Sequence, residues 1–268
     1  MVFCLLMLLL RASALANAFQ VVASPRTSRV QQMFPTAHTP QMKELSAPSL
    51  PRRAVWMKQA TLMWLAAALL GPCCDNLHSS QGVLHYAADS IAGPPLLVEL
   101  CFGNLRLETC WWVPCAFGGA GVVLGAAHPL LDRAWGSGLP RVPGWPVTLA
   151  AIASFLLCYG LSGWLAAAHG GTHLLAVDLP LLGAAAATFL IFERSKGGLL
   201  MMFLLATIGP CVEIGLINQL HLYAYTHPDF LGIPSWIPWV YAAGGPANGA
   251  LGRQVLHELT MREPKAGD

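Results

Sequence analysis

The sequence predicts an all-α fold: a polytopic membrane protein in which six transmembrane helices form a bundle, with both termini on the positively charged, cytosolic side. Three observations lead to this prediction. The chain is 55% hydrophobic and only 10% charged, whereas soluble domains average about 25% charged residues. Its apolar residues fall into six stretches of membrane-spanning length. Almost all of its lysines and arginines lie on one side of that arrangement.

The six apolar stretches are each about 17–25 residues long, which matches a hydrocarbon core about 30 Å thick. They cover residues 54–70, 111–131, 145–168, 174–192, 199–220 and 235–255. The first stretch is the shortest, and we expect it to end at Gly71-Pro72. Tryptophans lie near the ends of these stretches, as in the aromatic belts of membrane proteins: Trp56, Trp111, Trp112, Trp145, Trp236 and Trp239.

Lysine and arginine set the predicted direction of the spans. With the N-terminus inside, the inner segments are 1–53, 132–144, 193–198 and 256–268, together with the adjoining span ends. These segments hold every basic residue of the chain except Arg106. This asymmetry is the one that the positive-inside rule describes for six spans with both ends inside.

Residues 1–53 are predicted to lie outside the core fold, as a targeting segment or a disordered tail rich in Pro and Ser. The apolar run at 2–10 is typical of a secretory signal, whereas the lack of acidic residues before Glu44 is typical of a transit peptide, and both readings stay open. The six-span domain then covers 54–256, and 257–268 form a short tail. A net charge of +2 without a basic cluster predicts no nucleic-acid binding.

Two acids, Asp178 and Glu213, lie within the predicted spans, toward the outer ends of neighbouring helices, and Asn218 follows closely. An ionisable group at mid-depth in the membrane costs about 2.5–3.5 kcal/mol on insertion scales, so such residues usually face a cavity or a partner. Two interpretations therefore stay open. The three residues line a ligand cavity, or they reach water at the interface.

The charged pair Glu193-Arg194 closes the fourth span on the inside. One interpretation is an interfacial salt bridge or a topology-setting charge, and the other is a docking site for a partner protein. An exposed ion pair contributes only ~0–1 kcal/mol. Stability alone therefore gives little reason for these charges.

Small residues indicate where the helices approach each other closely. Prolines 238 and 246 lie in the last span, where they would break backbone hydrogen bonds and bend the helix. We expect helices to pack closely at two pairs of glycines spaced four residues apart and at one further glycine after the second pair. These positions are Gly121, Gly125, Gly245, Gly249 and Gly252.

The sequence offers no catalytic or metal-binding motif, and we expect no cofactor. His169 and His173 are four residues apart, but the intervening Gly170-Gly171 predicts a turn rather than a shared helix face. The eight cysteines form no C-x-x-C pair and lie mostly in or beside apolar spans. They are expected to be small core residues rather than a disulfide framework.

Several short motifs follow one another between residues 109 and 254. They are Trp111-Trp112-Val113-Pro114-Cys115, His128-Pro129-Leu130-Leu131-Asp132, Phe192-Glu193-Arg194-Ser195, Tyr225-Thr226-His227-Pro228-Asp229-Phe230-Leu231, Ser235-Trp236-Ile237-Pro238, and Gly244-Gly245 with Gly249 and Gly252-Arg253-Gln254. Because these motifs occur in this order and at these positions relative to the predicted spans, the chain resembles the insulin-induced gene (Insig) family of endoplasmic reticulum membrane proteins.

This resemblance implies a non-enzymatic regulator of sterol homeostasis that binds an oxysterol among its helices and holds sterol-sensing-domain membrane proteins in the endoplasmic reticulum. Glu193 stands where the family has a functionally required aspartate. Asp178 and Pro180 stand where the family has residues that help to line the sterol pocket.

Other functions and locations stay open beside this resemblance. The N-terminal segment also allows a plastid or another organelle membrane. The alternative functions are a small transporter or channel that uses Asp178 and Glu213 as a relay, and a lipid-modifying membrane enzyme.

Overall fold

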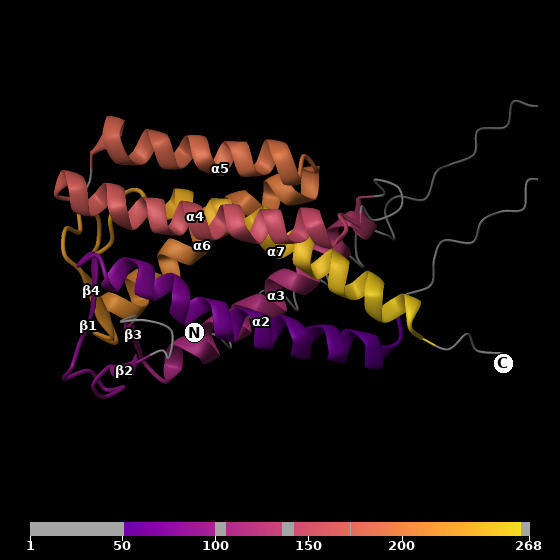
Figure 1. Cartoon of the computed structure of the whole chain (residues 1–268), viewed down its shortest axis with the longest axis horizontal. Coiled ribbons are helices and arrows are strands. Elements are labelled where there is room, and N and C mark those ends of the chain that lie inside the picture. The colour runs from indigo at the N-terminus through magenta and orange to yellow at the C-terminus, as the bar shows by residue number, and fades with distance from the viewer. Residues whose placement is uncertain (1–50, 100–105, 136–141, 172, 264–268) are drawn as a thin grey trace, which may run out of the picture. The chain divides into compact units, whose positions relative to one another are not determined.

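The structure, a computed structural model, describes residues 51–99, 106–135, 142–171 and 173–263. The chain divides after Leu50 into two units, and the described residues all belong to the second. The predictions for the N-terminal segment lie outside the described residues, apart from 51–53. The second unit is a bundle of long helices, which confirms the all-α prediction (Figure 1).

Six long helical segments make up the described part of the bundle. A π-helical turn, η1, leads directly into the fourth of them. Their bounds are α2 (Arg53–Ser79), α3 (Trp112–Ala134), α4 (Trp145–His169), η1 (Leu174–Asp178) with α5 (Leu179–Phe192), α6 (Lys196–Asn218) and α7 (Ile237–Met261).

The last helix, α7, forms the centre of the bundle. The other five helical segments of the described part are long and apolar enough to cross a membrane, but α7 is outside this group. It packs against α2, α3, α4, α5 and α6, and its residues 242–247 are all buried. Because its neighbours shield it from lipid, α7 accommodates small and polar residues that a lipid-facing helix excludes.

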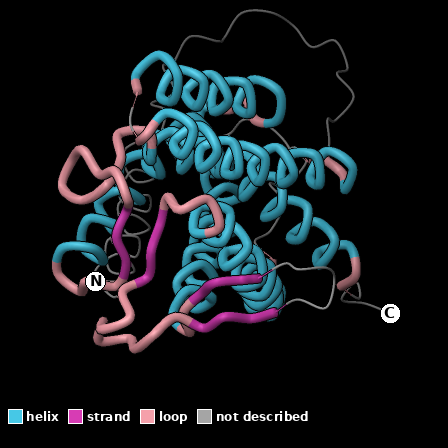
Figure 2. The backbone as a smooth tube through the Cα atoms, turned by 60° about the vertical axis from the view of Figure 1, so that its left-hand side comes forward, coloured by secondary structure: helices cyan, strands magenta, loops and turns pink. Residues whose placement is uncertain are grey.

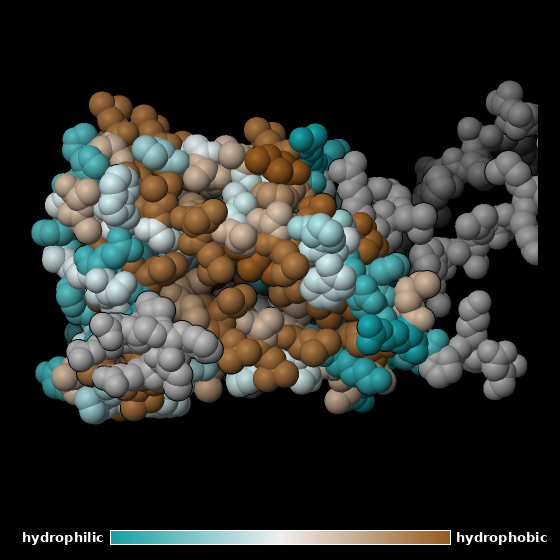
Figure 3. Space-filling view, viewed as in Figure 1, coloured by the Kyte–Doolittle hydropathy of each residue, from teal (hydrophilic) through white to brown (hydrophobic). Residues whose placement is uncertain are grey.

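The surrounding helices expose large apolar side chains instead. Leu69, Leu157, Leu175 and Phe203 are each at least two-thirds exposed. In water such a surface would promote association, whereas in a bilayer it contacts lipid tails. Figure 3 shows the result on one face of the molecule: apolar residues gather over the middle of the helices, with more polar residues toward both ends.

The first helix is longer than predicted, because α2 continues past Gly71-Pro72 to Ser79. Proline removes only one backbone donor, and neighbouring helices make such an interruption tolerable in a membrane bundle. A Cβ on Gly71 would lie 2.1 Å from Cγ of Phe117, so glycine is required for α3 to pack here. The extra turns carry Asp75 and His78 into the bundle.

Two short antiparallel ribbons lie outside the helices and were not predicted, since strands of three or four residues carry too little pattern. β1 (Leu84–Tyr86) pairs with β4 (Tyr223–Tyr225), and β2 (Leu96–Glu99) pairs with β3 (Arg106–Thr109) (Figure 2). In the first ribbon the tyrosines at 86, 223 and 225 are buried, whereas His85 and Ala224 are exposed. The β1–β4 ribbon therefore turns three tyrosines toward the bundle.

The two ends of the bundle differ in charge. We call the end where α2 begins and α7 ends the basic end, and the end that carries the β1–β4 ribbon the ribbon end. Seven exposed cations of the described residues lie at the basic end: Arg52, Arg53, Lys58, Arg133, Arg194, Lys196 and Arg262. This grouping is what the positive-inside prediction requires. The direction of the bundle in a membrane stays a prediction.

The expected effect of Pro238 on the last helix is wrong. Pro238 lies in the first turn of α7, where a backbone donor has no intrahelical acceptor to lose. Pro246 alone lies inside the helix, which continues beyond the predicted end at 255 to Met261.

The predicted packing glycines lie where helices meet. A Cβ on Gly121 would lie 2.5 Å from that of Ala67 on α2, and one on Gly125 would lie 2.6 Å from the side chain of Met63. On α7, Gly245 faces Met202, Gly249 faces His128, and Gly252 lies against the backbone of Gly125.

Candidate functional site

A buried ion network occupies the basic end of the bundle. The guanidinium group of Arg253 on α7 lies between the carboxylates of Asp132 on α3 and Glu193, which follows α5. Arg253 Nη2 donates to Asp132 Oδ1 at 2.9 Å and to Glu193 Oε1 at 3.0 Å, and Nη1 donates to Glu193 Oε2 at 2.6 Å. All three side chains are at most 8% exposed. One cation thus holds together the ends of three chain segments.

The turn between α5 and α6 places Glu193 in this network. Arg194 adopts a left-handed backbone conformation with φ of 59°, which reverses the chain. Ser195 then caps α6, because its hydroxyl accepts from the Gly198 N–H at 2.9 Å and donates to the Glu193 carboxylate. A Cβ on Gly198 would lie 2.0 Å from Cγ of Glu193. Glycine at this position leaves room for the carboxylate.

Two amide side chains extend the network to the neighbouring helices. Nε2 of Gln59 on α2 donates to the carbonyl oxygens of Gly125 and Gly252, both at 3.0 Å. The side chain of Gln254 accepts from the Gly144 N–H at the start of α4 at 2.9 Å. Buried polar groups that are fully bonded in this way fix one arrangement of helices.

The environment of Glu193 favours its ionised form. Burial alone would raise the pKa of the Glu193 carboxyl, but the hydrogen bonds and charge of Arg253, with the Ser195 hydroxyl, outweigh that effect and hold the pKa below its ordinary value of 4.5. The salt bridge foreseen between Glu193 and Arg194 is absent from the described ion pairs, because Arg253 takes that place and Arg194 is exposed.

We expect the stability contributed by Glu193 to disappear in acid. Because its folded pKa lies below the unfolded one, the contribution is present above about pH 4.5 and is lost as the pH falls through the folded value. Thermal unfolding in detergent between about pH 7 and about pH 3 measures this loss. Glu193→Gln should be less stable than the parent at neutral pH and approach it in acid. Glu258→Gln, on a half-exposed part of α7, serves as the control; an equal acid response in the parent and Glu193→Gln would contradict the assignment.

A cavity of about 770 Å³ opens beside this network at the basic end. Its volume lies within the range of about 300–1,000 Å³ that is typical of small-molecule sites. Asp132, Glu193, Ser195 and Arg253 contribute polar groups to its wall. Its apolar lining comes from α3, α4, α5, α7 and the segment before α4: Leu131, Trp135, Val142, Pro143, Val147, Ile191, Phe192 and Ala250.

The predicted ligand residues lie at the other end and do not form one site. Glu213 is 6% exposed and accepts from Tyr225 and Tyr241, each at 2.8 Å. Asp178, 7% exposed, ends η1 and accepts from Ser235 at 2.9 Å. The interpretation that both acids reach water is therefore wrong.

Asn218 has a local role in the chain path. Its side chain is exposed, and its amide donates to the backbone oxygens of Ile214 and Leu231, the latter at 2.7 Å. These bonds hold the loop that precedes α7 against the end of α6. Asn218 thus has different partners from Asp178 and Glu213, and no described bond links any two of the three residues.

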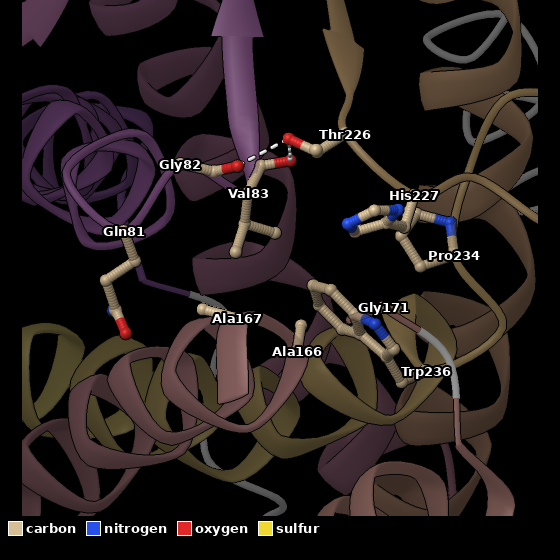
Figure 4. Close-up of a pocket in the computed structure, with 10 residues that line it drawn as sticks. All are labelled: Gln81, Gly82, Val83, Ala166, Ala167, Gly171, Thr226, His227, Pro234 and Trp236. Atoms are coloured by element: carbon tan, nitrogen blue, oxygen red, sulfur yellow. Dashed lines mark hydrogen bonds between the residues drawn. The ribbon is translucent and has the colours of Figure 1, made fainter. Parts of the chain in front are cut away.

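A second, smaller cavity of about 150 Å³ lies at the ribbon end (Figure 4). Ala166 of α4, His227 and Trp236 line it together with residues 81–83, which precede β1. There the Thr226 hydroxyl donates to the carbonyl oxygen of Gly82 and so joins the residue that follows β4 to the turn that precedes β1. Its volume is below that of typical small-molecule sites. The larger cavity is therefore the better candidate for a lipid.

The sequence interpretation missed two groups of residues. Asp132 and Arg253 were noted only within motifs, although an arginine inside a predicted span signals a buried partner. The second group is the set of tyrosines around Glu213, together with Asp75, which lies beyond the predicted end of the first stretch at residue 70. A longer first helix would have indicated a third acid within the predicted spans, beside Asp178 and Glu213.

Comparisons with known proteins agree with this architecture. No protein-family model matches the chain. It is 24% identical over 233 residues to the insulin-induced gene 1 protein of Gallus gallus, covering 87% of this chain and 86% of that protein. It is 28% identical over 162 residues to the insulin-induced gene 2 protein of the same species, covering 60% of this chain and 68% of that protein.

A solved structure shares the fold. The crystal structure of MvINS, a mycobacterial Insig homolog from Mycobacterium vanbaalenii, superposes with a TM-score of 0.61 at 23% sequence identity. The superposition covers 78% of this chain and 97% of that chain. The six-helix arrangement described above is thus also found in that protein.

Proposed function

The chain is an Insig-like membrane protein, and from that premise we propose that it is a non-enzymatic regulator in sterol homeostasis. In this proposal it resides in the endoplasmic reticulum membrane as a multi-pass protein. It binds an oxysterol-like lipid within the helix bundle and thereby retains or releases sterol-sensing membrane partners.

The cavity at the basic end is the observation that carries the proposal. An oxysterol combines a rigid apolar body with a few hydroxyl groups. The cavity offers matching surfaces, since Leu131, Val147 and Phe192 supply apolar walls and the carboxylates of Glu193 and Asp132 supply hydrogen-bond acceptors. In this proposal the sterol body lies against the apolar wall and a hydroxyl donates to the ion network.

The turn between α5 and α6 is the proposed contact with a partner. Arg194 and Lys196 are exposed beside the cavity, whereas Glu193 is buried and bonded to Arg253. Arg194 therefore contacts the partner directly, and Glu193 acts by holding the turn in place. A ligand that reaches Glu193 would alter the turn and so the partner surface.

Photo-crosslinking tests the lipid site. The purified protein in detergent is incubated with a photoreactive oxysterol, with unlabelled oxysterol or a phospholipid as competitor. We expect saturable labelling that oxysterol suppresses and that maps to residues lining the cavity. Val147→Trp, which fills part of the cavity, should abolish most of the labelling, whereas Leu149→Trp, two residues along the same helix and outside the lining, should retain it.

Three outcomes would argue against this proposal. Labelling that phospholipid suppresses equally well would indicate a general lipid groove. Labelling that Val147→Trp leaves unchanged would move the site elsewhere. Absence of competed labelling in a folded preparation would indicate that the fold is shared with the Insig proteins without the sterol ligand.

A further inference from the structure

All five tyrosines of the chain gather around two buried carboxylates near the ribbon end. Asp75 accepts from Tyr86 at 2.9 Å and from Tyr159 at 3.3 Å. Glu213 accepts from Tyr225 and Tyr241, each at 2.8 Å, and the ring of Tyr223 lies 6.0 Å from that of Tyr225. We call these seven residues the tyrosine cluster. It joins α2, α4, α6 and α7 to the β1–β4 ribbon.

No cation offsets the charge of this cluster among the residues that the structure describes. The ion pairs found there involve Arg253, Arg262 and His128, and none reaches Asp75 or Glu213. The tyrosines act as donors. Burial, and then the charge of Asp75, raises the pKa of the Tyr86 hydroxyl, and burial followed by the charge of Glu213 does the same for Tyr225. Both hydroxyls therefore keep their protons at physiological pH.

The two carboxylates are 8% and 6% exposed, and their donors Tyr86 and Tyr225 lie on the paired strands β1 and β4, so the ribbon brings both acids into one buried region. Two like charges in a low-dielectric site do not both ionise readily, and a pair of carboxylates in such a site shares a proton. We propose that Asp75 and Glu213 form a proton-binding site of the folded protein, and that loss of the bound proton loosens the β1–β4 ribbon from the bundle. The site is distinct from the lipid cavity at the basic end.

The other ionisable groups around the pair cannot replace that proton. On the Asp75 side they are the thiols of Cys74 on α2 and Cys110 before α3 and the tyrosines of β1 and α4, and none of these side chains can carry a positive charge. His78 of α2 stacks on Tyr159 at 4.4 Å and bonds to Ser162 rather than to a carboxylate. On the Glu213 side, among the residues that the structure describes, Tyr225 of β4 and Tyr241 of α7 supply the hydrogen bonds to the carboxylate.

The ribbon is the element that this proton would control. Tyr86 on β1 and Tyr225 on β4 each bond to one of the two carboxylates, and the strands pair with each other. When both acids are charged, their repulsion opposes the arrangement in which Tyr86 and Tyr225 bond to them and keep both strands packed against the helices. Release of the proton therefore weakens the attachment of the ribbon to the helices or breaks it. This change takes place at the ribbon end and involves no contact with the basic end.

Infrared spectroscopy of the full-length protein in lipid nanodiscs tests the proposal directly. A protonated carboxylic acid has a carbonyl stretching band that a carboxylate lacks. We expect the parent protein to show this band at about pH 7 and to lose it as the pH rises. Asp75→Asn and Glu213→Gln, which keep an acceptor for the tyrosines, should each remove the pH-dependent part of the band. Glu258→Gln, on a half-exposed stretch of α7, should leave it unchanged.

Thermal unfolding supplies a second readout. A proton bound in the folded state and released on unfolding stabilises the protein at lower pH, and this stability is lost as the pH rises through the folded value. The parent should therefore melt at a lower temperature in alkali, and Glu213→Gln should lose most of that dependence. If neither variant changes the band or the pH dependence, the proposal is overturned. A melting temperature that rises with sodium or potassium at constant ionic strength, without a carbonyl band, would also overturn it in favour of a cation site.

Discussion

Replacing Arg253 with methionine should destabilise the protein by about 3–5 kcal/mol, the range found when one partner of a buried ion network is removed. Methionine preserves much of the side-chain volume but leaves Asp132 and Glu193 buried side by side without a cation. Both carboxylates lose charge-assisted hydrogen bonds of 2.6–3.0 Å. Because they belong to different helices, the basic end should open as well as weaken.

Thermal unfolding in detergent, with limited proteolysis of the α5–α6 turn, would measure this effect. Arg262→Met provides a matched control, since Arg262 directly follows the same helix, its side chain is 79% exposed, and it pairs with Glu258 at a distance of 3.8 Å. That variant should shift stability by no more than about 1 kcal/mol. If the two arginine variants melted at the same temperature, the buried network would have no structural role.

A combined variant distinguishes two contributions to the loss of stability: the loss of the ion network itself and the burial of carboxylates without a cation. Adding Glu193→Gln and Asp132→Asn to Arg253→Met removes the two negative charges that the single variant leaves buried without a cation. We expect the triple variant to recover part of the lost stability, because replacing a whole buried network is often near neutral whereas breaking it is not. A triple variant less stable than the single one would show that the carboxylates have other essential contacts.

The helices could be predicted because membrane spans are encoded locally. A stretch of about 20 apolar residues identifies a span without knowledge of its neighbours. Five of the six predicted stretches coincide with helices that are long and apolar enough to cross a membrane. The sixth stretch, 235–255, was predicted by the same length rule, and it is helical as α7 although α7 is not among the helices apolar enough to count as a span. The early end given to α2 followed a local rule about Gly-Pro, and packing against Phe117 overrides that rule.

The functional residues were harder to predict because their partners are distant in sequence. Arg253 meets residues 60 and 121 positions away, and no local pattern indicates which acid it will contact. Glu193 was singled out for its charge and its resemblance to a required residue, yet its burial depends on the α5–α6 turn. Asp75, Glu213 and the tyrosines come from six separate segments, and only the assembled bundle brings them together.

Gly252→Ala should disrupt the meeting point of α2, α3 and α7. A Cβ at this position would lie 2.4 Å from the carbonyl oxygen and 2.8 Å from Cα of Gly125. Both atoms belong to the backbone of α3, so a rotamer change cannot relieve the clash and the two helices must move apart. Overpacking of this kind typically costs about 1–3 kcal/mol.

The same displacement affects the polar contacts beside it. Gln59 donates to the carbonyl oxygens of both Gly125 and Gly252, so separation of α3 from α7 breaks at least one of these bonds. Arg253 is the next residue, and its bonds to Asp132 on α3 should weaken too. The loss of stability for Gly252→Ala should therefore exceed the overpacking cost alone, and helix-to-helix cross-linking between α3 and α7 should fall.

Gly119→Ala on α3 provides the matched control. No atom lies within 4 Å of a Cβ at that position, and alanine favours a helix over glycine by about 0.5–1 kcal/mol. Gly119→Ala should thus match or exceed the parent in melting temperature while Gly252→Ala falls below it. Equal melting temperatures for the two variants would mean that α3 and α7 do not approach at Gly125 and Gly252. The contact is then absent in the membrane, and the ion network beside it loses the support of close backbone packing.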